Sequence, residues 1–402
     1  MKNKNLNNNQ PAIILGLFET ALGIARSLGR KGISVYGIDK SKDIGFYSKY
    51  IKATLCPDPV LYEDKFINWL ENYISGFNEK PILYFTSDDY LMAFTKNRDM
   101  FEDKVSYILP EHDFLEKVAD KYSQYNLAKE ANVAVPETKI VSKSAYVNDF
   151  KGMDYPLFIK GLEVNSWRIV FGGTQKGFLI NDEDDLIKVL TEIKKHNIKA
   201  IVQEVIPGPD QHHFKYCTLR DNEGNELNKF TLKKIRQYPP HFGVGSVVES
   251  VSNKKLEKAG KQFFDKIKYK GVGSAEFKLD QRDGKWKLIE LNPRYWQQNS
   301  LAYSTGADFA LNQYLSLTNQ KIKEQKNFET GVKWINIYMD FASFLKYRKE
   351  GEITFWKWLR SLKGPKVFSD FAWDDLKPFL YEWGFGLKLL KAPVFLINKL
   401  IK

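Results

Sequence analysis

Two glutamates in neighbouring apolar runs restrict the fold of this chain more than any other feature. Glu276 and Glu290 lie in short runs that are separated by the polar turn 281–285, which contains Asp-Gly. A turn of this kind predicts a β-hairpin. Antiparallel pairing would place the two carboxylates side by side, where they repel each other unless a cation lies between them. A hard divalent cation fits, and Asn292 faces the same side of its strand and can supply a third oxygen. The alternative is that both glutamates face solvent on an ordinary hairpin.

The first part of the chain alternates between strand and helix patterns. Residues 11–15 and 33–39 read as strands around a helix at 19–30, and a helix at 66–74 precedes a strand at 81–85. This alternation predicts a parallel sheet in a doubly wound domain, which we place at residues 1–115.

A dinucleotide-binding role for this domain is disfavoured. Gly16 and Gly23 do not form the G-x-G-x-x-G loop that lets the backbone approach a pyrophosphate. We therefore expect the domain to hold a substrate at its strand ends.

The middle of the chain predicts an α+β region. Two helices are expected at 114–119 and 122–131. Short strands separated by helices follow at 157–160, 200–204, 273–277 and 287–291.

The run 288–294 resembles the E-x-N-x-R metal-binding signature of ATP-grasp enzymes, and further pieces follow in that family's order. Lys121, Lys160, the stretch 203–208 and Glu276 all match family positions. Within the family, the chain resembles the carbamoyl-phosphate-synthase-like proteins, which include D-aspartate ligase. The resemblance implies a doubly wound α/β domain, then an ATP-grasp module of two α+β subdomains at residues 116–320.

The resemblance also implies a role for each matching residue. Lys121 and Lys160 would neutralise the phosphates of ATP. The adenine hinge would consist of Gln203, Glu204, Val205 and Ile206, and the ribose would contact Asp210 or its rival His212. Mg²⁺ or Mn²⁺ would bind Glu276, Glu290 and Asn292. Substrate or acyl-phosphate would contact Arg294, Lys234 and Arg236, although a basic surface strand is an equal alternative for the last two.

One segment departs from the family pattern. Many ATP-grasp enzymes close a compact Gly/Ser-rich loop over the phosphates, whereas residues 165–176 of this chain include Trp167, Arg168, Phe171 and Lys176. Either the cations replace backbone amides there, or the loop accommodates a larger substrate.

The implied reaction is the ATP- and Mg²⁺-dependent joining of a carboxylate to an amine through an acyl-phosphate, with release of ADP. The two substrates are not identified, and the family context is cell-wall or exopolysaccharide synthesis. The alternative is an ATP-binding regulator or membrane-attached adaptor without ligase activity.

The charge of the chain is uneven. Its net charge is +12, and residues 330–402 contribute 13 Lys+Arg and 7 Asp+Glu. We expect this stretch to form a basic, aromatic, helical extension. In a helix over 385–402 four lysines form a narrow stripe beside a wide apolar face, which fits either an anionic membrane surface or packing on the protein. Nucleic acid is not expected as a partner, because no nucleic-acid module is recognisable.

The compartment is inferred from what the chain contains. It has only two cysteines, a polar start and no apolar run of membrane-spanning length. We expect a cytoplasmic protein, with peripheral attachment to the inner membrane face left open. A homodimer is likewise left open.

Overall fold

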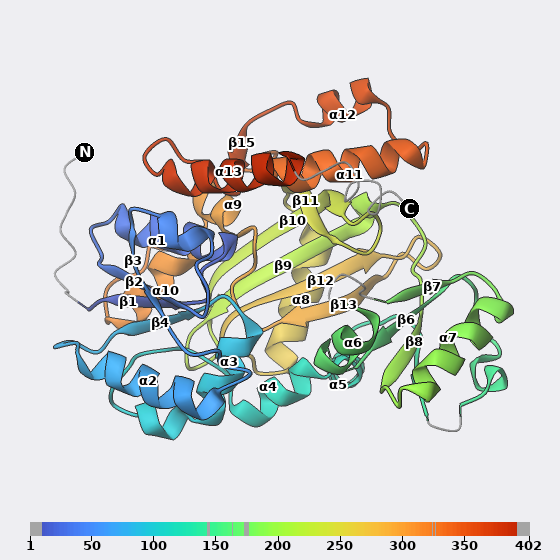
Figure 1. Cartoon of the computed structure of the whole chain (residues 1–402), viewed down its shortest axis with the longest axis horizontal. Coiled ribbons are helices and arrows are strands. Elements are labelled where there is room, and N and C mark those ends of the chain that lie inside the picture. Colours follow the sequence, from blue (N-terminus) through green and yellow to red (C-terminus); the bar gives the residue numbers. More distant parts are fainter. Residues whose placement is uncertain are drawn as a thin grey trace.

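Three sheets and the helices around them form the structure (Figure 1). The computed structural model describes residues 10–142, 145–162, 164–172, 177–323, 325 and 327–391; for 164, 165, 168 and 385–391 only the backbone is described. The parallel sheet lies on the left of Figure 1, a seven-stranded sheet in the centre and an antiparallel four-stranded sheet on the right. The mixture of parallel and antiparallel sheets confirms the predicted combination of α/β and α+β architecture.

The N-terminal sheet is fully parallel, with strand order β3-β2-β1-β4. Its strands are β1 (Ala12–Leu15), β2 (Val35–Asp39), β3 (Ile51–Leu55) and β4 (Ile82–Phe85). The helices of this part are α1 (Glu19–Gly29), α2 (Glu63–Ser75) and α3 (Asp88–Lys96), with a 3₁₀ turn η1 (Ile44–Tyr47). The sequence pattern missed β3 because this edge strand is only partly buried and mixes Lys52 and Thr54 with apolar residues.

Two helices, α4 (His112–Ala119) and α5 (Lys121–Glu130), lead from this sheet to the antiparallel four-stranded sheet. That sheet has the order β5-β8-β6-β7. Its elements are β5 (Thr138–Val141), β6 (Leu157–Gly161), α6 (Val164–Phe171), β7 (Phe178–Ile180), α7 (Glu183–Lys195) and β8 (Ala200–Glu204).

The segment expected to be a phosphate-covering loop begins as a helix. Residues 164–171 form α6, and Trp167 packs in the core of this sheet against Phe171 and Phe178. Large aromatic side chains favour this packing over a flexible Gly-rich loop. Residues 173–176, including Lys176, lie outside the described part of the chain.

The seven-stranded sheet has the order β13-β12-β9-β10-β11-β14-β15. Its first five strands are antiparallel to their neighbours. The elements up to the end of this region are β9 (His213–Arg220), β10 (Glu226–Tyr238), β11 (Val244–Ser250), α8 (Lys254–Lys266), β12 (Gly271–Leu279), β13 (Trp286–Asn292), α9 (Asn299–Ser304) and α10 (Phe309–Leu317). A 3₁₀ turn, η4 (Asp210–His212), precedes β9.

The sequence pattern predicted a helical extension at the end of the chain, but the last described part also contains strands. Strands β14 (Lys333–Ile335) and β15 (Lys366–Phe368) join the edge of the seven-stranded sheet beside β11. The helices are α11 (Ile337–Lys349), α12 (Phe355–Ser361) and α13 (Lys377–Lys391). The lysine stripe expected at 385–402 lies outside the described residues, apart from the backbone of 385–391.

One hydrophobic core joins the parallel sheet to the seven-stranded sheet. It contains Ile14 and Ile24 from the N-terminal part together with Cys217, Phe230 and Trp296. A continuous core fixes the strand ends of the first domain relative to the central sheet. Within the described residues no helix is both long and apolar enough to cross a membrane.

Candidate active site

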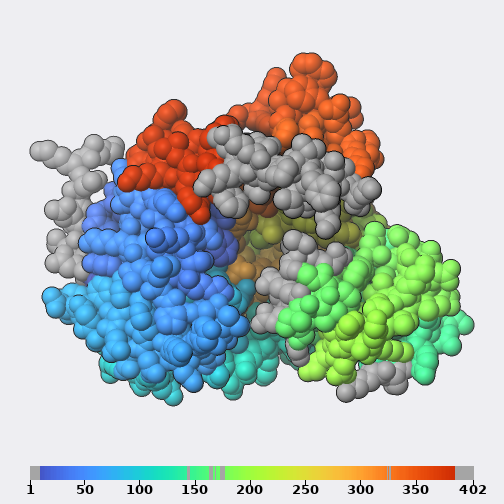
Figure 2. All heavy atoms as spheres, viewed as in Figure 1, coloured from blue at the N-terminus to red at the C-terminus, as the bar shows by residue number. Residues whose placement is uncertain are grey.

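The predicted hairpin is present, and it pairs the two glutamates directly. β12 and β13 run antiparallel with Glu276 opposite Glu290 and Ser274 opposite Asn292. Directly opposed side chains on one face of a sheet lie close together. The two carboxylates therefore share one face of the hairpin, as the sequence predicted. Figure 2 shows a recess between the blue N-terminal residues and the green four-stranded sheet.

Lys121 is the partner of Glu290. Its Nζ lies 2.9 Å from Glu290 Oε1, and Asn292 Nδ2 donates to Glu290 Oε2 at 3.4 Å. The positive charge of Lys121 holds the pKa of Glu290 well below its usual value, and that carboxylate in turn raises the pKa of Lys121 to about 12. The pair is therefore ionised across the physiological pH range.

Helix α5 holds Lys121 in place. Asp120 caps the helix by accepting a hydrogen bond from Ser123 N–H. One turn later, Gln124 binds both the N–H and the C=O of Leu291 on β13. Lys121 is consequently fixed over the strand that carries Glu290.

Glu276 is buried among three basic side chains. Lys234 Nζ donates to Glu276 Oε1, while His213 Nδ1 and Lys215 Nζ lie 3.3 and 3.8 Å from its carboxylate oxygens. Burial alone would raise the pKa of Glu276, but Lys234, His213 and Lys215 more than offset that effect and hold it well below its usual value. Sequence reasoning had selected Lys234 but not Lys215.

Lys160 lies at the end of β6 and contacts α5 and β8. Its Nζ donates to Tyr125 Oη at 2.9 Å and to Gln203 Oε1 at 3.1 Å. Gln203 in turn donates from Nε2 to Thr138 Oγ1 at 2.9 Å. Lys160 thus belongs to the four-stranded sheet but also contacts the helix that carries Lys121.

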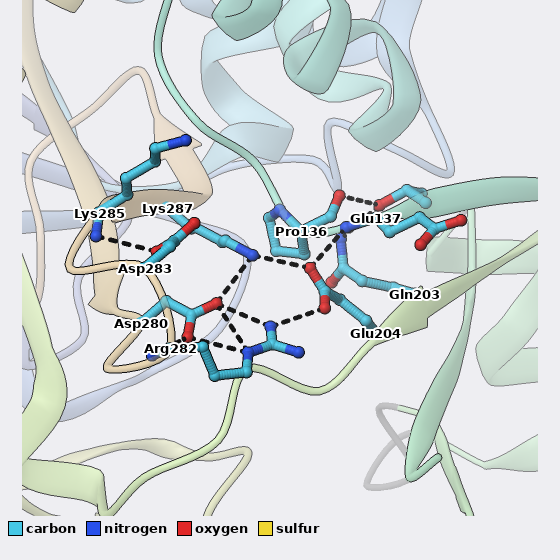
Figure 3. Close-up of polar contacts among 10 residues, drawn as sticks. Pro136, Glu137, Gln203, Glu204, Asp280, Arg282, Asp283, Lys285 and Lys287 are labelled. Carbon is cyan, nitrogen blue, oxygen red and sulfur yellow. Dashed lines mark hydrogen bonds and ion pairs between the residues drawn. The ribbon is translucent and has the colours of Figure 1, made fainter. Parts of the chain in front are cut away.

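Glu204, the last residue of β8, is tied to the hairpin turn by its side chain (Figure 3). Arg282 Nη2 donates to Oε2 at 2.8 Å and Lys287 Nζ to Oε1 at 3.0 Å. Both cations also bind Asp280. This network joins the four-stranded sheet to the seven-stranded sheet, and sequence reasoning missed it because its members are far apart along the chain.

The backbone beyond β8 is also anchored. Glu204 N–H donates to Glu137 O at 2.9 Å and Val205 N–H to Pro156 O at 3.2 Å. Ile206 is buried. These bonds fix the start of the stretch that was predicted to contact adenine.

Asp210 has partners within the protein in place of a ribose. Gln237 Nε2 donates to its Oδ1 at 2.7 Å, Tyr347 Oη donates to Oδ2, and His241 Nδ1 lies 3.5 Å from Oδ1. Burial would raise the pKa of Asp210, but His241, Tyr347 and Gln237 together lower it. His212, the rival residue, lies beside Gln281, with its Nε2 3.5 Å from Nε2 of that side chain.

Arg294 connects the hairpin to the first domain. Its Nε donates to Asp88 Oδ1 at 2.9 Å, and its Nη2 donates to Asn292 Oδ1 at 3.4 Å. Asp88 begins α3, at the carboxyl edge of the parallel sheet. The structure therefore brings that edge next to the two glutamates.

Arg236 forms an ion pair with helix α11. Its Nε and Nη2 bind both oxygens of Asp340 on α11, at 2.7 and 3.0 Å, and both side chains are buried. A bidentate pair of this kind leaves Nη1, which binds Ser361 Oγ. In the structure Arg236 holds α11 in place through Asp340. The resemblance had implied that Arg236 contacts substrate.

The protein-family comparison matches the description "Carbamoyl-phosphate synthase L chain, ATP binding domain" over residues 120–324, half of the 402-residue chain. The chain belongs to this ATP-grasp family. The match spans α5, the four-stranded sheet, and strands β9 to β13 of the seven-stranded sheet with the hairpin.

Individual relatives agree with that assignment. D-aspartate ligase of Enterococcus faecium is 25% identical over 315 residues, covering 74% of each chain. An ADP complex of N5-carboxyaminoimidazole ribonucleotide synthetase has a TM-score of 0.62 at 13% identity, covering 82% of each chain. The biotin carboxylase domain dimer of a Hydrogenobacter thermophilus 2-oxoglutarate carboxylase, with MgADP, has a TM-score of 0.61 at 16% identity, covering 81% of this chain and 74% of that one. At these identities the two structures show a shared fold.

Three residues of the hairpin have donor atoms that fit Mg²⁺. Glu276, Glu290 and Asn292 present oxygens on one face of the hairpin, and hard divalent cations prefer oxygen ligands. Ser274 Oγ, opposite Asn292, is buried without a hydrogen-bond partner among the described residues. Lysines now neutralise both glutamates, so a metal ion would act together with these cations.

Lys215 and His213 could have been found from one signal. Both alternate with the aromatic residues Phe214 and Tyr216 along β9, which places them on the same face as each other and beside Glu276. Burial lowers the pKa of Lys215 and of His213. Charged residues in the register of a buried strand indicate a site that needs them.

We predict that Lys160→Met weakens ATP binding by about 10- to 100-fold, since a hydrogen bond to a charged group contributes about 1.5–3 kcal/mol. Titration of Mg²⁺-ATP against both proteins by calorimetry measures the change. Lys139→Met is the matched control, because Lys139 lies on β5 of the same sheet and binds the Asp149 carbonyl oxygen. Equal affinities for wild type and Lys160→Met would contradict the assignment.

We also predict a pH-dependent contribution from Glu204. Burial opposes ionisation, but Arg282, the Glu137 N–H and Lys287 outweigh it and lower the pKa of Glu204 in the folded chain. A depressed pKa stabilises the fold above the unfolded value, near pH 4, and this contribution is lost as the pH falls further. Glu204→Gln should therefore lower the urea midpoint at pH 7 and have progressively less effect below about pH 4. Exposed Glu130→Gln is the control; a constant difference at all pH values would refute the prediction.

Proposed function

We propose that this chain is an ADP-forming ligase that joins a carboxylate to an amine. The observation that carries the proposal is the direct pairing of Glu276 with Glu290, flanked by Asn292 and by three lysines, within a chain of the ATP-grasp family. The name of the Enterococcus relative and the ADP of the similar structures support the same chemistry.

The proposed reaction has two balanced steps. A carboxylate oxygen attacks the γ-phosphorus of ATP; the bond to the β-phosphate oxygen breaks, and ADP leaves. The amine nitrogen then attacks the acyl carbon, the bond to phosphate breaks, and the nitrogen loses a proton. Mg²⁺ or Mn²⁺, when bound, would offset phosphate charge in the first step.

The residues of the chain act mainly by position and charge. In the proposal Glu276, Glu290 and Asn292 bind the metal ion, while Lys121 and Lys160 neutralise phosphate. The stretch from Gln203 to Ile206 receives adenine. Arg294 forks onto a carboxylate or phosphate, and Lys234 contributes a buried positive charge next to Glu276.

Some predicted roles need the local contacts to change. Asp210 would have to exchange Tyr347 or Gln237 for a ribose hydroxyl. Arg236 would have to leave both oxygens of buried Asp340 before it could hold a substrate, whereas Arg294 pairs through Nε with the exposed carboxylate of Asp88, so we assign the substrate contact to Arg294. Lys234 donates to Glu276, Gln237 and Gly243, so its proposed role is the positive charge beside Glu276.

Wider aspects of the proposal follow from the relatives and the charge of the chain. We propose that the chain divides into domains at residues 1–115, 116–320 and 330–402. We propose that it acts on a cell-wall or exopolysaccharide precursor. We also propose that it is a cytoplasmic enzyme that attaches to the inner membrane face through its basic, aromatic C-terminal extension. A homodimer is supported only by the dimeric biotin carboxylase domain.

The test is ADP and phosphate release from Mg²⁺-ATP with a panel of amino acids and other carboxylates. ADP release that depends on a carboxylate supports the ligase. Nucleotide binding without turnover across the panel would favour the regulator or adaptor, and absence of ATP binding would refute both.

A further inference from the structure

The last described part of the chain concentrates exposed apolar side chains. Among the described residues, 22 large hydrophobic side chains are exposed, and ten of them lie between residues 337 and 383. All three exposed tryptophans belong to this group: Trp356, Trp373 and Trp383 expose 69%, 84% and 48% of their surface. Large exposed apolar patches indicate a binding surface, whereas single exposed residues do not.

The aromatic side chains of this part form two groups of ring contacts, one between α11 and α12 and one that includes α13 and the start of α11. Ring contacts join Phe341 to Trp358 at 6.2 Å and Phe355 to Trp356 at 5.4 Å. On α13, the Phe379 and Trp383 rings lie 5.9 Å apart, and Tyr338 of α11 contacts Trp383 at 6.3 Å. We call the exposed part the aromatic surface and define it by Phe341, Phe355, Trp356, Trp373, Leu380 and Trp383.

The aromatic surface lies at the outer side of the molecule. Helices α11 and α13 run along the top of Figure 1, and α12 lies beyond them. Figure 2 shows α12, in orange, projecting from the body of the protein.

Positive charge accompanies the aromatic side chains. Lys357, Arg360, Lys363 and Lys366 are all exposed, and residues 353–369 contain no acidic side chain. Along α12 the cations alternate with Phe355, Trp356 and Leu359, which are also exposed. Aromatic rings next to Lys and Arg are the composition found where proteins meet a membrane interface.

Most acidic side chains of the same region form ion pairs with side chains of other regions. The pairs are Asp340 with Arg236, Asp374 with Arg30, Asp375 with Arg26, and Glu350 and Glu352 with His241. Their negative charge is compensated by cations outside this region. The stretch 353–369, with four exposed cations and no acidic side chain, therefore keeps an excess of positive charge.

We propose that the aromatic surface docks on an anionic lipid membrane. Trp356, Trp373 and Trp383 would enter the headgroup layer, with Leu380 beneath it, while Lys357 and Arg360 contact lipid phosphates. Each Lys or Arg near such a membrane contributes about 1 kcal/mol, and the attraction decreases with salt. This contact assigns the membrane attachment proposed above to residues 341–383 and so rests on that part of the proposed function, but it does not depend on the ligase reaction.

A second copy of the chain fits the same surface poorly. A two-fold dimer would bring the patch against itself, so that Lys357, Arg360, Lys363 and Lys366 would face an identical set without an acidic partner. Interface cores are depleted of charged residues. Nucleic acid would use the rings but not the exposed Leu359 and Leu380, whereas a lipid interface accommodates both.

Vesicle flotation of the full chain, without nucleotide, tests the proposal. Vesicles of phosphatidylcholine containing phosphatidylglycerol should bind the protein, and pure phosphatidylcholine vesicles should bind it at least about tenfold more weakly. Lys357→Glu/Arg360→Glu and Trp356→Ser/Trp373→Ser should each reduce binding by about tenfold or more.

Matched control variants alter the same kinds of side chain at other places on the protein surface. Lys254→Glu/Lys255→Glu reverses two exposed charges on α8, and Leu61→Ser removes an exposed apolar side chain from the first domain. Both should bind like wild type. Circular dichroism should show the same fold for every variant, because all the altered side chains are exposed.

Three results would overturn the proposal. One is equal binding to neutral and anionic vesicles. Another is normal binding by both surface variants, especially if Lys399→Glu/Lys402→Glu alone abolishes it. The last is a dimer in solution that only the surface variants disrupt, or tight single-stranded DNA binding through the same residues without vesicle binding.

Discussion

Glu290→Gln should lower the rate of carboxylate-dependent ADP formation by about a thousandfold, because it removes one charge of the carboxylate pair that would hold the metal ion. The amide keeps the size of the side chain and can still accept a hydrogen bond from Lys121. The fold should therefore persist. Steady-state kinetics at saturating Mg²⁺-ATP, together with calorimetric ATP titration, measures both effects.

A matched control separates metal binding from loss of a strand ion pair. Glu249 also lies on a strand of the seven-stranded sheet and pairs with a lysine, Lys233, at 3.0 Å. It has no opposing carboxylate in its register with β10 or β14. Glu249→Gln should keep activity within a few-fold of wild type. Similar losses in both variants would mean that Glu290 acts only through the sheet.

Arg236→Met should lower the free energy of unfolding by about 3–5 kcal/mol, because Asp340 would remain buried without its main cation. Trp358 Nε1 and Ser246 Oγ would still donate to Asp340, at 2.8 and 3.4 Å, but they carry no charge to offset it. The effect should be concentrated where α11 packs on β10. Urea unfolding and hydrogen exchange of α11 measure it.

The double variant Arg236→Met/Asp340→Leu distinguishes docking from catalysis. Replacing both members of a buried ion pair by apolar residues is often close to neutral for stability. The double variant should therefore recover most of the lost stability and also the activity. Recovered stability with activity still lost would show that Arg236 takes part in the reaction, as the family resemblance implied.

The local signals in the sequence were sufficient for the elements that position the site. The Asp-Gly turn between two apolar runs predicted the β12–β13 hairpin, and the spacing of Glu290 and Asn292 placed both on one face. The regular apolar spacing after Gly16 likewise predicted α1. In each case neighbouring residues determine the structure, and strongly periodic patterns are specific.

Contacts between segments that are far apart in the sequence could not be predicted from such local signals. Arg236 meets Asp340 across 104 positions, and Arg282 meets Glu204 across 78. A basic residue in a predicted strand looks the same before folding whether its partner is a substrate or a buried carboxylate. Likewise, Trp167 and Phe171 gave no indication that their segment forms helix α6, because tertiary packing decides that outcome.

The aromatic surface bears on where in the cell the proposed reaction would take place. If the ligase acts where α12 meets lipid, a substrate carried by a membrane would be brought near the protein, although this consequence rests on the proposed function. The active-site measurements and the vesicle measurements remain independent of each other. Either can fail without changing the interpretation of the other.

The most direct test of the proposed chemistry follows an oxygen atom. Once the panel identifies an active carboxylate, that carboxylate is labelled with a heavy oxygen isotope, and the products are analysed by mass spectrometry after one turnover. An acyl-phosphate route predicts ADP together with inorganic phosphate that carries one labelled oxygen. Unlabelled phosphate, or label in AMP with release of pyrophosphate, would contradict it.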